Sequence, residues 1–275
     1  MGIRINTNIA SINTRRHLYN ATTAYNKAME KLSSGLRINR AADDAAGLAI
    51  SEGLKSDIRA LEQASRNASD GISMVQVAEG ALDEVSTILL RLRELAEQSL
   101  NGTLTDVERS YLDSEYTALL SEIDRISLSV DFNGRTLLDG TGGSVAIQVG
   151  IGTAAYDHID VDLSNSMDAA GLLLAAGVGT AADAATAMDE VVAAVSIVSN
   201  ARSSFGAIQN RLESSIRNIN NQAENLSSAN SRIRDVDVAR ETSNLTSWQI
   251  LQQAGVSMLA QANMSSNLAL KLLQG

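Results

Sequence analysis

The stretch KLSSGLRINRAADDAAGLAISE, Lys31–Glu52, interrupts an otherwise helical pattern and decides how the chain is organised. On both sides of it, apolar residues recur at three- and four-residue steps, which is the spacing of one helix face. Gly35 can adopt the left-handed conformation that ends a helix without a Cβ penalty. Asp43 or Asp44 can cap the following helix by accepting its free N–H groups. The stretch therefore predicts a structured junction between two helices.

The same apolar spacing predicts long helices in most of the chain. Their expected ranges are a first helix ending at 32, then 45–100, a helix after a capping box at Thr105 and Glu108, then 183–234 and 245–273. The chain contains no proline, and aromatic residues make up only 3% of it, which suits packed helices better than a compact mixed core. We expect a mainly α fold, a long antiparallel helical bundle or coiled-coil rod with paired N- and C-terminal helices.

A small β element is predicted in the middle of the chain, at about residues 130–184. FNGRTLLDG (Phe132–Gly140) is typical of a hairpin, because Asn-Gly supplies the positive φ angles of a tight turn. Two strand candidates follow, Ser144–Val149 and Tyr156–Leu163, and the second alternates apolar and polar residues. Its polar side carries His158, Asp160 and Asp162, which we interpret as a solvated strand face rather than a metal site.

Composition and motifs argue against several function classes. The net charge of −10 argues against a nucleic-acid binder, and the absence of cysteine excludes disulfides and thiolate metal sites. We find no apolar run of a secretory signal near the N-terminus and no stretch of roughly 18–20 apolar residues, so we expect no membrane span. No His, Lys or nucleophile accompanies the pair Asp43–Asp44 in sequence. We expect no enzyme, no catalytic residue, no metal ligand and no cofactor.

The C-terminal segment needs a partner. Between Glu241 and Lys271 it carries no charged residue, and an uncharged amphipathic helix is not stable when fully exposed. It can pair with the N-terminal helix and with copies of the chain. A head-to-tail contact that does not close on itself generates a helical filament. The residues alone therefore favour a self-assembling structural protein.

Seven segments carry a resemblance to a known family. They are INTNIASINTRR (5–16), KLSSGLRINRAADDAAGLAISE (31–52), ASDGISMVQVAEGALDEV (68–85), RLRELAEQS (91–99), FNGRTLLDG (132–140), NLSSANSRIRDVDVARE (225–241) and ILQQAGVSMLAQAN (250–263). They lie in order in two blocks, at about 1–140 and 185–275, and closely resemble bacterial flagellin. The short middle looks like a minimal form without large outer domains.

The resemblance implies a subunit of the flagellar filament, secreted unfolded through the flagellum's own export channel and used for swimming. Residues 1–44 and 236–275 would form the inner tube, and residues 45–235 the outer body. Implied partners are many copies of the chain, an export chaperone on the C-terminal helix, the junction and cap proteins of the flagellum, and an animal innate immune receptor. The receptor contacts would match Arg91, Leu95 and Glu115. Neither nucleic acid nor a membrane is an expected partner.

The expected assembly interface combines apolar positions of the terminal helices with charged positions of the junction. These residues are Ile5, Ile9, Ile12, Leu18, Tyr25, Leu32, Arg37, Arg40, Asp43, Asp44, Arg232, Arg234, Asp235, Asp237, Trp248, Leu251, Met258, Leu259 and Leu268. Two alternatives stay open. One is a hook–filament junction protein of the same superfamily, and the other is a metal-binding or enzymatic module around His158.

Overall fold

The computed structural model describes the backbone of residues 7–274 and the side chains of residues 7–264. The chain divides into two compact units. Unit 1 comprises Met1–Ser56 and Asn225–Gly275, and unit 2 comprises Asp57–Glu224. Helices α2 (Ala45–Ser99) and α4 (Ala181–Arg234) each extend from one unit into the other.

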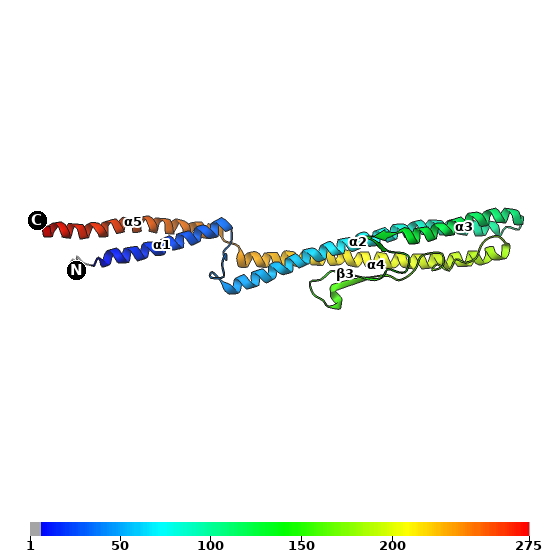
Figure 1. Cartoon of the computed structure of the whole chain (residues 1–275), viewed down its shortest axis with the longest axis horizontal. Coiled ribbons are helices and arrows are strands. Elements are labelled where there is room, and N and C mark those ends of the chain that lie inside the picture. Colours follow the sequence, from blue (N-terminus) through cyan, green and yellow to red (C-terminus); the bar gives the residue numbers. More distant parts are fainter. Residues whose placement is uncertain (1–6, 275) are drawn as a thin grey trace. The chain divides into compact units, whose positions relative to one another are not determined.

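Unit 1 is built on the pair of helices α1 (Ile9–Ser34) and α5 (Val238–Gln274), which run side by side in opposite directions (Figure 1). Contacts along the pair fix its register. The Asn8 amide donates to the carbonyl of Ala262 at 2.9 Å, and the Gln252 amide donates to the Thr22 hydroxyl at 3.3 Å. Between them, a Cβ on Gly255 would meet Leu18 Cδ1 at 3.3 Å. The predicted antiparallel pairing of the terminal helices is confirmed.

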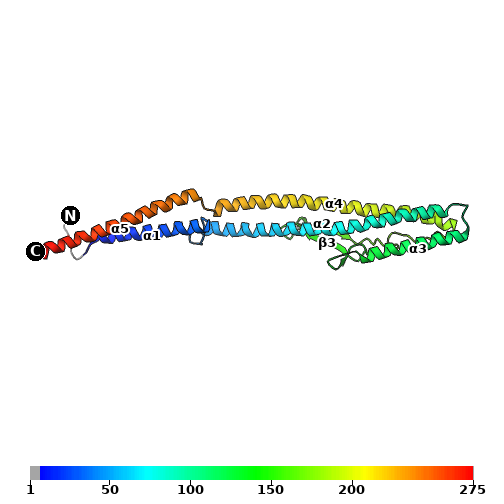
Figure 2. The same ribbon diagram turned by 90° about the horizontal axis from the view of Figure 1, so that it is seen from above.

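In unit 2, helices α2, α3 (Asp106–Ser129) and α4 lie side by side in both views (Figures 1 and 2). Their buried residues recur every seven positions, the repeat that keeps one seam facing a neighbouring helix. On α2 these residues are Leu61, Ala68, Val75, Leu82, Leu89 and Ala96. On α4 they are Ala184, Val191, Val198, Phe205, Leu212 and Ile219. The core of unit 2 is therefore a helical seam, as the apolar spacing predicted.

Helix α4 also contains an 18-residue window with a mean hydropathy of 1.3, long and apolar enough to cross a membrane by composition alone. The sequence predicted no membrane span, because no continuous run of 18–20 residues is apolar. The buried seven-residue row of α4 supplies part of the apolar character, and 28% of the window is buried in the structure.

Local signals placed the end of α1 and the start of α3 correctly, whereas α5 begins at Val238 and not at the predicted residue 245. Gly35 has a φ of 72° and ends α1 in the left-handed conformation. Thr105 and Glu108 form the predicted capping box at the start of α3, and the bonds from Thr105 hold the pKa of Glu108 below its usual value. The turn before α3 is fixed by the buried Arg109, which donates to the carbonyls of Ser99 at 2.9 Å and Asn101 at 3.0 Å.

The β element consists of two separate antiparallel hairpins. Strands β1 (Asp131–Phe132) and β2 (Arg135–Thr136) flank Asn133 and Gly134, whose φ angles of 53° and 77° are those of the predicted tight turn. Strand β3 (Gly143–Gln148) pairs with β4 (His158–Leu163), and the apolar residues of β4 are buried in alternation. The short 3-10 helix η1 (Ala155–Asp157) precedes β4.

Carboxylates of the helices hold the irregular segment 164–180 in place. Asp124 accepts the N–H of Ala169, Asp113 accepts that of Val178, and Glu190 accepts those of residues 175 and 176, all between 2.7 and 2.9 Å. Segment 164–180 carries no Lys or Arg, so its main chain supplies the donors that these acids need. Beside two of these acids, the pKa of the buried Tyr116 is raised to about 12, chiefly by burial and then by Glu190 and Asp113.

Gly71 allows β3 to lie directly on α2. It occupies a buried position of the helix, and a Cβ built there would meet Ile147 Cδ1 at 2.3 Å and Cγ2 at 3.3 Å. The Asn67 amide bonds the carbonyl of Gln148 at the same contact, at 3.3 Å. The glycine therefore allows the close approach of a strand to the helix.

We expect Gly71→Leu to lower the free energy of unfolding by about 1–3 kcal/mol, because the new side chain overpacks the contact with Ile147. Gly80→Leu is the matched control, since Gly80 is exposed on the same helix and nothing lies within 4 Å of its built Cβ. Leucine is a better helix former than glycine, so the control should gain up to about 1 kcal/mol. Urea unfolding followed by circular dichroism measures both. Equal effects of the two substitutions would contradict the assigned contact.

Candidate assembly surface

A main-chain bridge holds together the two chain segments at the junction of unit 1. Leu36 and Asp235 pair as an isolated antiparallel bridge. The N–H of Arg37 donates to the carbonyl of Arg234 at 2.6 Å, and the N–H of Val236 donates to that of Gly35 at 3.0 Å. The Arg37 guanidinium adds two bonds to the Ile233 carbonyl, at 2.5 and 3.1 Å. The end of α1 is thereby fixed against the end of α4 and the start of α5.

Three ion pairs brace this junction from within the chain. Lys27 contacts Asp43 at 2.6 Å, Glu30 contacts Arg40 at 2.8 Å, and Glu52 contacts Arg234 at 2.5 Å. Asp43 also accepts the N–H groups of residues 39 and 40, both at 3.3 Å. The Lys27 ammonium is the main reason that the pKa of Asp43 lies below its usual value, against an opposing effect of burial.

From the sequence, the charged residues of the junction were expected at the assembly interface, without assigned pairs. They form two sets, Arg37, Arg40, Asp43 and Asp44 in one segment and Arg232, Arg234, Asp235 and Asp237 in the other. Among the described residues, no ion pair within the chain joins these two sets. The actual partners Lys27, Glu30 and Glu52 were missed, because no local sequence signal marks a contact between separate elements. Whether charged contacts form between subunits stays a prediction.

Asp44 and Asp237 are helix caps, and the cap at Asp44 is one of the two that the sequence predicted. Asp44 accepts the N–H of Gly47 at 2.9 Å at the start of α2, and Asp237 accepts that of Arg240 at 3.1 Å at the start of α5. Asp235 instead accepts the Ser231 hydroxyl at 2.7 Å. The acids of the junction are thus bound to structural donors.

The predicted apolar interface residues fall into two groups. Some are half-buried and recur at the spacing of the α1–α5 seam: Leu18, Tyr25 and Leu32 on α1, and Trp248 and Leu259 on α5. Others are exposed: Ile9, Ile12, Leu251 and Met258. Ile5 lies outside the described residues, as does the side chain of Leu268. Only the exposed group is available to a second copy without opening the helix pair.

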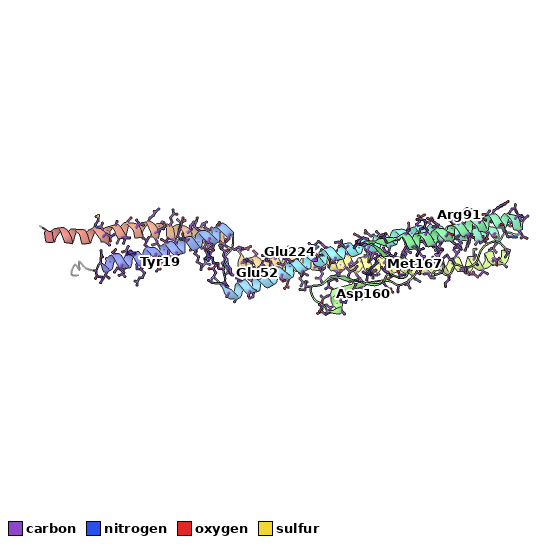
Figure 3. The ribbon with its side chains drawn as sticks, in the orientation of Figure 1. Tyr19, Glu52, Arg91, Asp160, Met167 and Glu224 are labelled. Carbon is purple, nitrogen blue, oxygen red and sulfur yellow. The ribbon has the colours of Figure 1, made fainter. Side chains whose placement is uncertain are left out.

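The structure adds further exposed apolar residues that the sequence analysis missed. We call the whole group the outward apolar set. It comprises Ile9, Ile12, Tyr19 (labelled in Figure 3) and Met29 on α1, and Val238, Ile250, Leu251, Val256, Met258 and Met264 on α5. In the sequence they could have been found as apolar residues that lie outside the row of three- and four-residue steps facing the partner helix.

Unit 1 has almost no apolar core to set against this exposed surface. Among the described residues, its buried apolar side chains are only Ala21, Ala28 and Ile38. The remaining buried apolar residues of the chain belong to unit 2. A unit that exposes more large apolar side chains than it buries is typical of a protein that completes its core by association.

The residues considered for a metal site differ in exposure and in contacts. On β4, His158 is half-exposed, Asp160 is exposed (Figure 3), and Asp162 accepts the N–H and hydroxyl of Ser164, which lowers the pKa of Asp162. The searched part of the chain holds no group of three or more His, Cys, Asp or Glu arranged to bind a metal ion.

The residues matched to an immune-receptor contact differ in accessibility. Arg91, marked in Figure 3, and Glu115 are about half-exposed and form an ion pair of 2.8 Å between α2 and α3. Leu95 is 0% exposed and lies in the core of unit 2. Its side chain therefore supports the position of α2 and is not part of the surface of the folded unit.

The Lys27–Asp43 pair makes the stability of the junction depend on pH. Because folding lowers the pKa of Asp43, the stabilisation is present above the unfolded value of about 4 and is lost as pH falls through the lower folded value. We expect Asp43→Asn to reduce the free energy of unfolding at pH 7 by about 1 kcal/mol and to flatten its decline between pH 5 and 3.

Thermal unfolding at pH 7, 5 and 3 measures this effect. Asp44→Asn is the matched control, because asparagine caps a helix about as well as aspartate does. If the stability of the native protein and that of Asp43→Asn change with pH in parallel, the Lys27–Asp43 pair contributes nothing to the pH dependence.

Comparison with known proteins places this architecture in a family. The family model described as the bacterial flagellin N-terminal helical region matches residues 5–143, and the one described as the C-terminal helical region matches residues 188–273. The chain is 48% identical to a flagellin of Halalkalibacterium halodurans over 273 residues, covering 98% of this chain and 99% of the relative. It is 44% identical to a flagellin of Bacillus subtilis over 304 residues, covering 99% of this chain and 100% of the relative.

A solved structure supports the same assignment. The crystal structure of Bacillus cereus flagellin superposes with a TM-score of 0.51 at 32% identity, covering 60% of this chain and 94% of that one. Family matches at both ends and identity along the whole length agree with the paired terminal helices and the helical bundle. The chain belongs to the bacterial flagellin family.

Proposed function

We propose that the chain is a structural subunit of the bacterial flagellar filament and that it assembles through the outward apolar set of α1 and α5. The observation that carries this proposal is the imbalance in unit 1, where, among the described side chains, ten large apolar ones of the helix pair are exposed and three apolar ones are buried. Association with further copies removes that surface from water, at about 25 cal/mol per Å² of apolar area.

The outward apolar set offers continuous rows along both helices. Ile12 and Tyr19 are seven residues apart on α1, and Leu251 and Met258 are seven apart on α5, so each pair lies on one helix face. A contact between such rows and a different surface of the next copy is heterologous. Repeated without closure, it produces a helical filament rather than a ring.

The interface charges of the junction remain part of the proposal. Arg37, Arg40 and Arg232 are exposed in the single chain and can meet acids of a neighbouring copy. Such contacts would set the register between subunits, while the apolar rows supply most of the association free energy.

Secretion and further partners follow from membership in the family. We propose that the chain leaves the cell unfolded through the flagellar export channel, since a chain with no proline and no cysteine avoids slow isomerisation and cross-linking on refolding. An export chaperone would cover the uncharged part of α5 before assembly. Junction and cap proteins of the flagellum would contact the ends of the filament.

Recognition by an innate immune receptor is a separate proposal for unit 2. Arg91 and Glu115 supply a half-exposed charged pair on adjacent helices, which a protein surface of complementary charge can bind. Leu95 contributes through the packing beneath them.

We expect Leu251→Asn combined with Met258→Asn to abolish polymerisation of the purified protein while leaving its helical content unchanged. Both side chains are more than half-exposed in the single chain, so their replacement removes little packing within it. Gln253→Asn combined with Ser257→Asn is the matched control on the same helix, because these exposed positions are already polar. Sedimentation and negative-stain electron microscopy after seeding measure assembly. Normal filaments from the first variant would overturn the proposed surface.

Removal of residues 248–275 provides a second test. Unit 2 keeps its whole core in this truncation, so we expect a soluble, helical protein that forms no filament. Filaments from the truncated chain, seen by electron microscopy, would contradict the role of the terminal helix pair.

A further inference from the structure

Among the methionines that the structure describes, the exposed ones are confined to unit 1. Met29, Met258 and Met264 have 46%, 61% and 59% of their surface exposed. In unit 2, Met74 and Met167 have only 6% and 3% exposed, and Met188 is half-buried. Because the reaction of a thioether with an oxidant requires access to its sulfur, the two units differ sharply in susceptibility to oxidation.

The exposed methionines of α5 lie on the rows that the proposed function assigns to assembly. Met258 follows Leu251 by seven residues, and Met264 follows Ile250 by fourteen, so each methionine shares a helix face with an exposed aliphatic residue. Their neighbours Gly255 and Leu259 belong to the seam with α1. Oxidation at Met258 or Met264 therefore changes the outward surface without disturbing the seam.

We propose that Met258 and Met264, with Met29 on α1, are oxidation sites whose modification blocks assembly of the chain. A peroxide transfers one oxygen atom to the thioether sulfur, which is oxidised to the sulfoxide, while the peroxide is reduced to water or an alcohol. The sulfoxide is polar and must lose its hydration when a second copy covers it. The proposal rests on the proposed function, because it requires these side chains to be buried between copies.

The consequence is a reversible control of assembly at the level of the free subunit. Before assembly the three thioethers are open to oxidant. After assembly the neighbouring copies shield those that lie in the contact. Enzymatic reduction of the sulfoxide by methionine sulfoxide reductase returns the apolar side chain and with it the capacity to assemble.

The experiment treats the purified full-length protein with hydrogen peroxide before and after seeded polymerisation. Peptide mass spectrometry measures sulfoxide at each methionine, and sedimentation measures assembly. We expect oxidation of the free subunit at Met29, Met258 and Met264, with Met74 and Met167 spared. The concentration needed for assembly should rise about tenfold or more, since tenfold corresponds to about 1.4 kcal/mol, which lies within the cost of burying a polar group without a partner. Treatment with methionine sulfoxide reductase should restore assembly at the original concentration.

A matched pair of variants separates these sites from general damage. Met29→Leu, Met258→Leu and Met264→Leu combined should assemble normally after peroxide treatment, because leucine keeps the apolar volume and carries no sulfur. Assembly of the variant that combines Met74→Leu with Met167→Leu should remain as sensitive to peroxide as assembly of the native protein. Normal assembly of oxidised native protein, or loss of assembly by the oxidised triple variant, would overturn the inference. Failure of the untreated protein to polymerise would instead contradict the proposed function itself.

Discussion

The two main-chain hydrogen bonds between Gly35–Arg37 and Arg234–Val236 are the constraint on which unit 1 depends. They join the segment that leaves α1 to the segment that enters α5, at N···O distances of 2.6 and 3.0 Å. With both segments held at one point, the register of α1 along α5 is determined. Leu18 then meets Gly255, and Thr22 meets Gln252. The seam residues follow from that register, and so does the identity of the side chains left facing outward.

The two units solve the problem of apolar burial in different ways. Unit 2 closes its own core with seven-residue rows on α2 and α4, and its loops are held by carboxylates that accept main-chain N–H groups. Unit 1 is a pair of helices, and two helices cannot cover all of the apolar surface that they carry. If the proposed assembly buries this surface, the stability of unit 1 is linked to association, and the population of the ordered unit rises with subunit concentration.

Sequence reasoning recovered the features that depend on neighbouring residues. Helix ranges follow from the 3.6-residue period, the cap of α3 from Thr105 and Glu108, and the first hairpin from Asn133 and Gly134. It failed where residues distant in sequence meet. No pattern marks Lys27 as the partner of Asp43, and the division of apolar residues between the seam and the outward set required the register of the helix pair. The contact between Gly71 and Ile147 likewise could only be found in three dimensions.

The central claim is that the outward faces of α1 and α5 form the contacts between copies. The most direct measurement is a structure by electron cryomicroscopy of the polymer that this chain forms. We expect the side chains of Ile12, Tyr19, Leu251 and Met258 to be buried between subunits in that polymer. A polymer whose contacts are made by unit 2 alone, with these four side chains still in water, would contradict it.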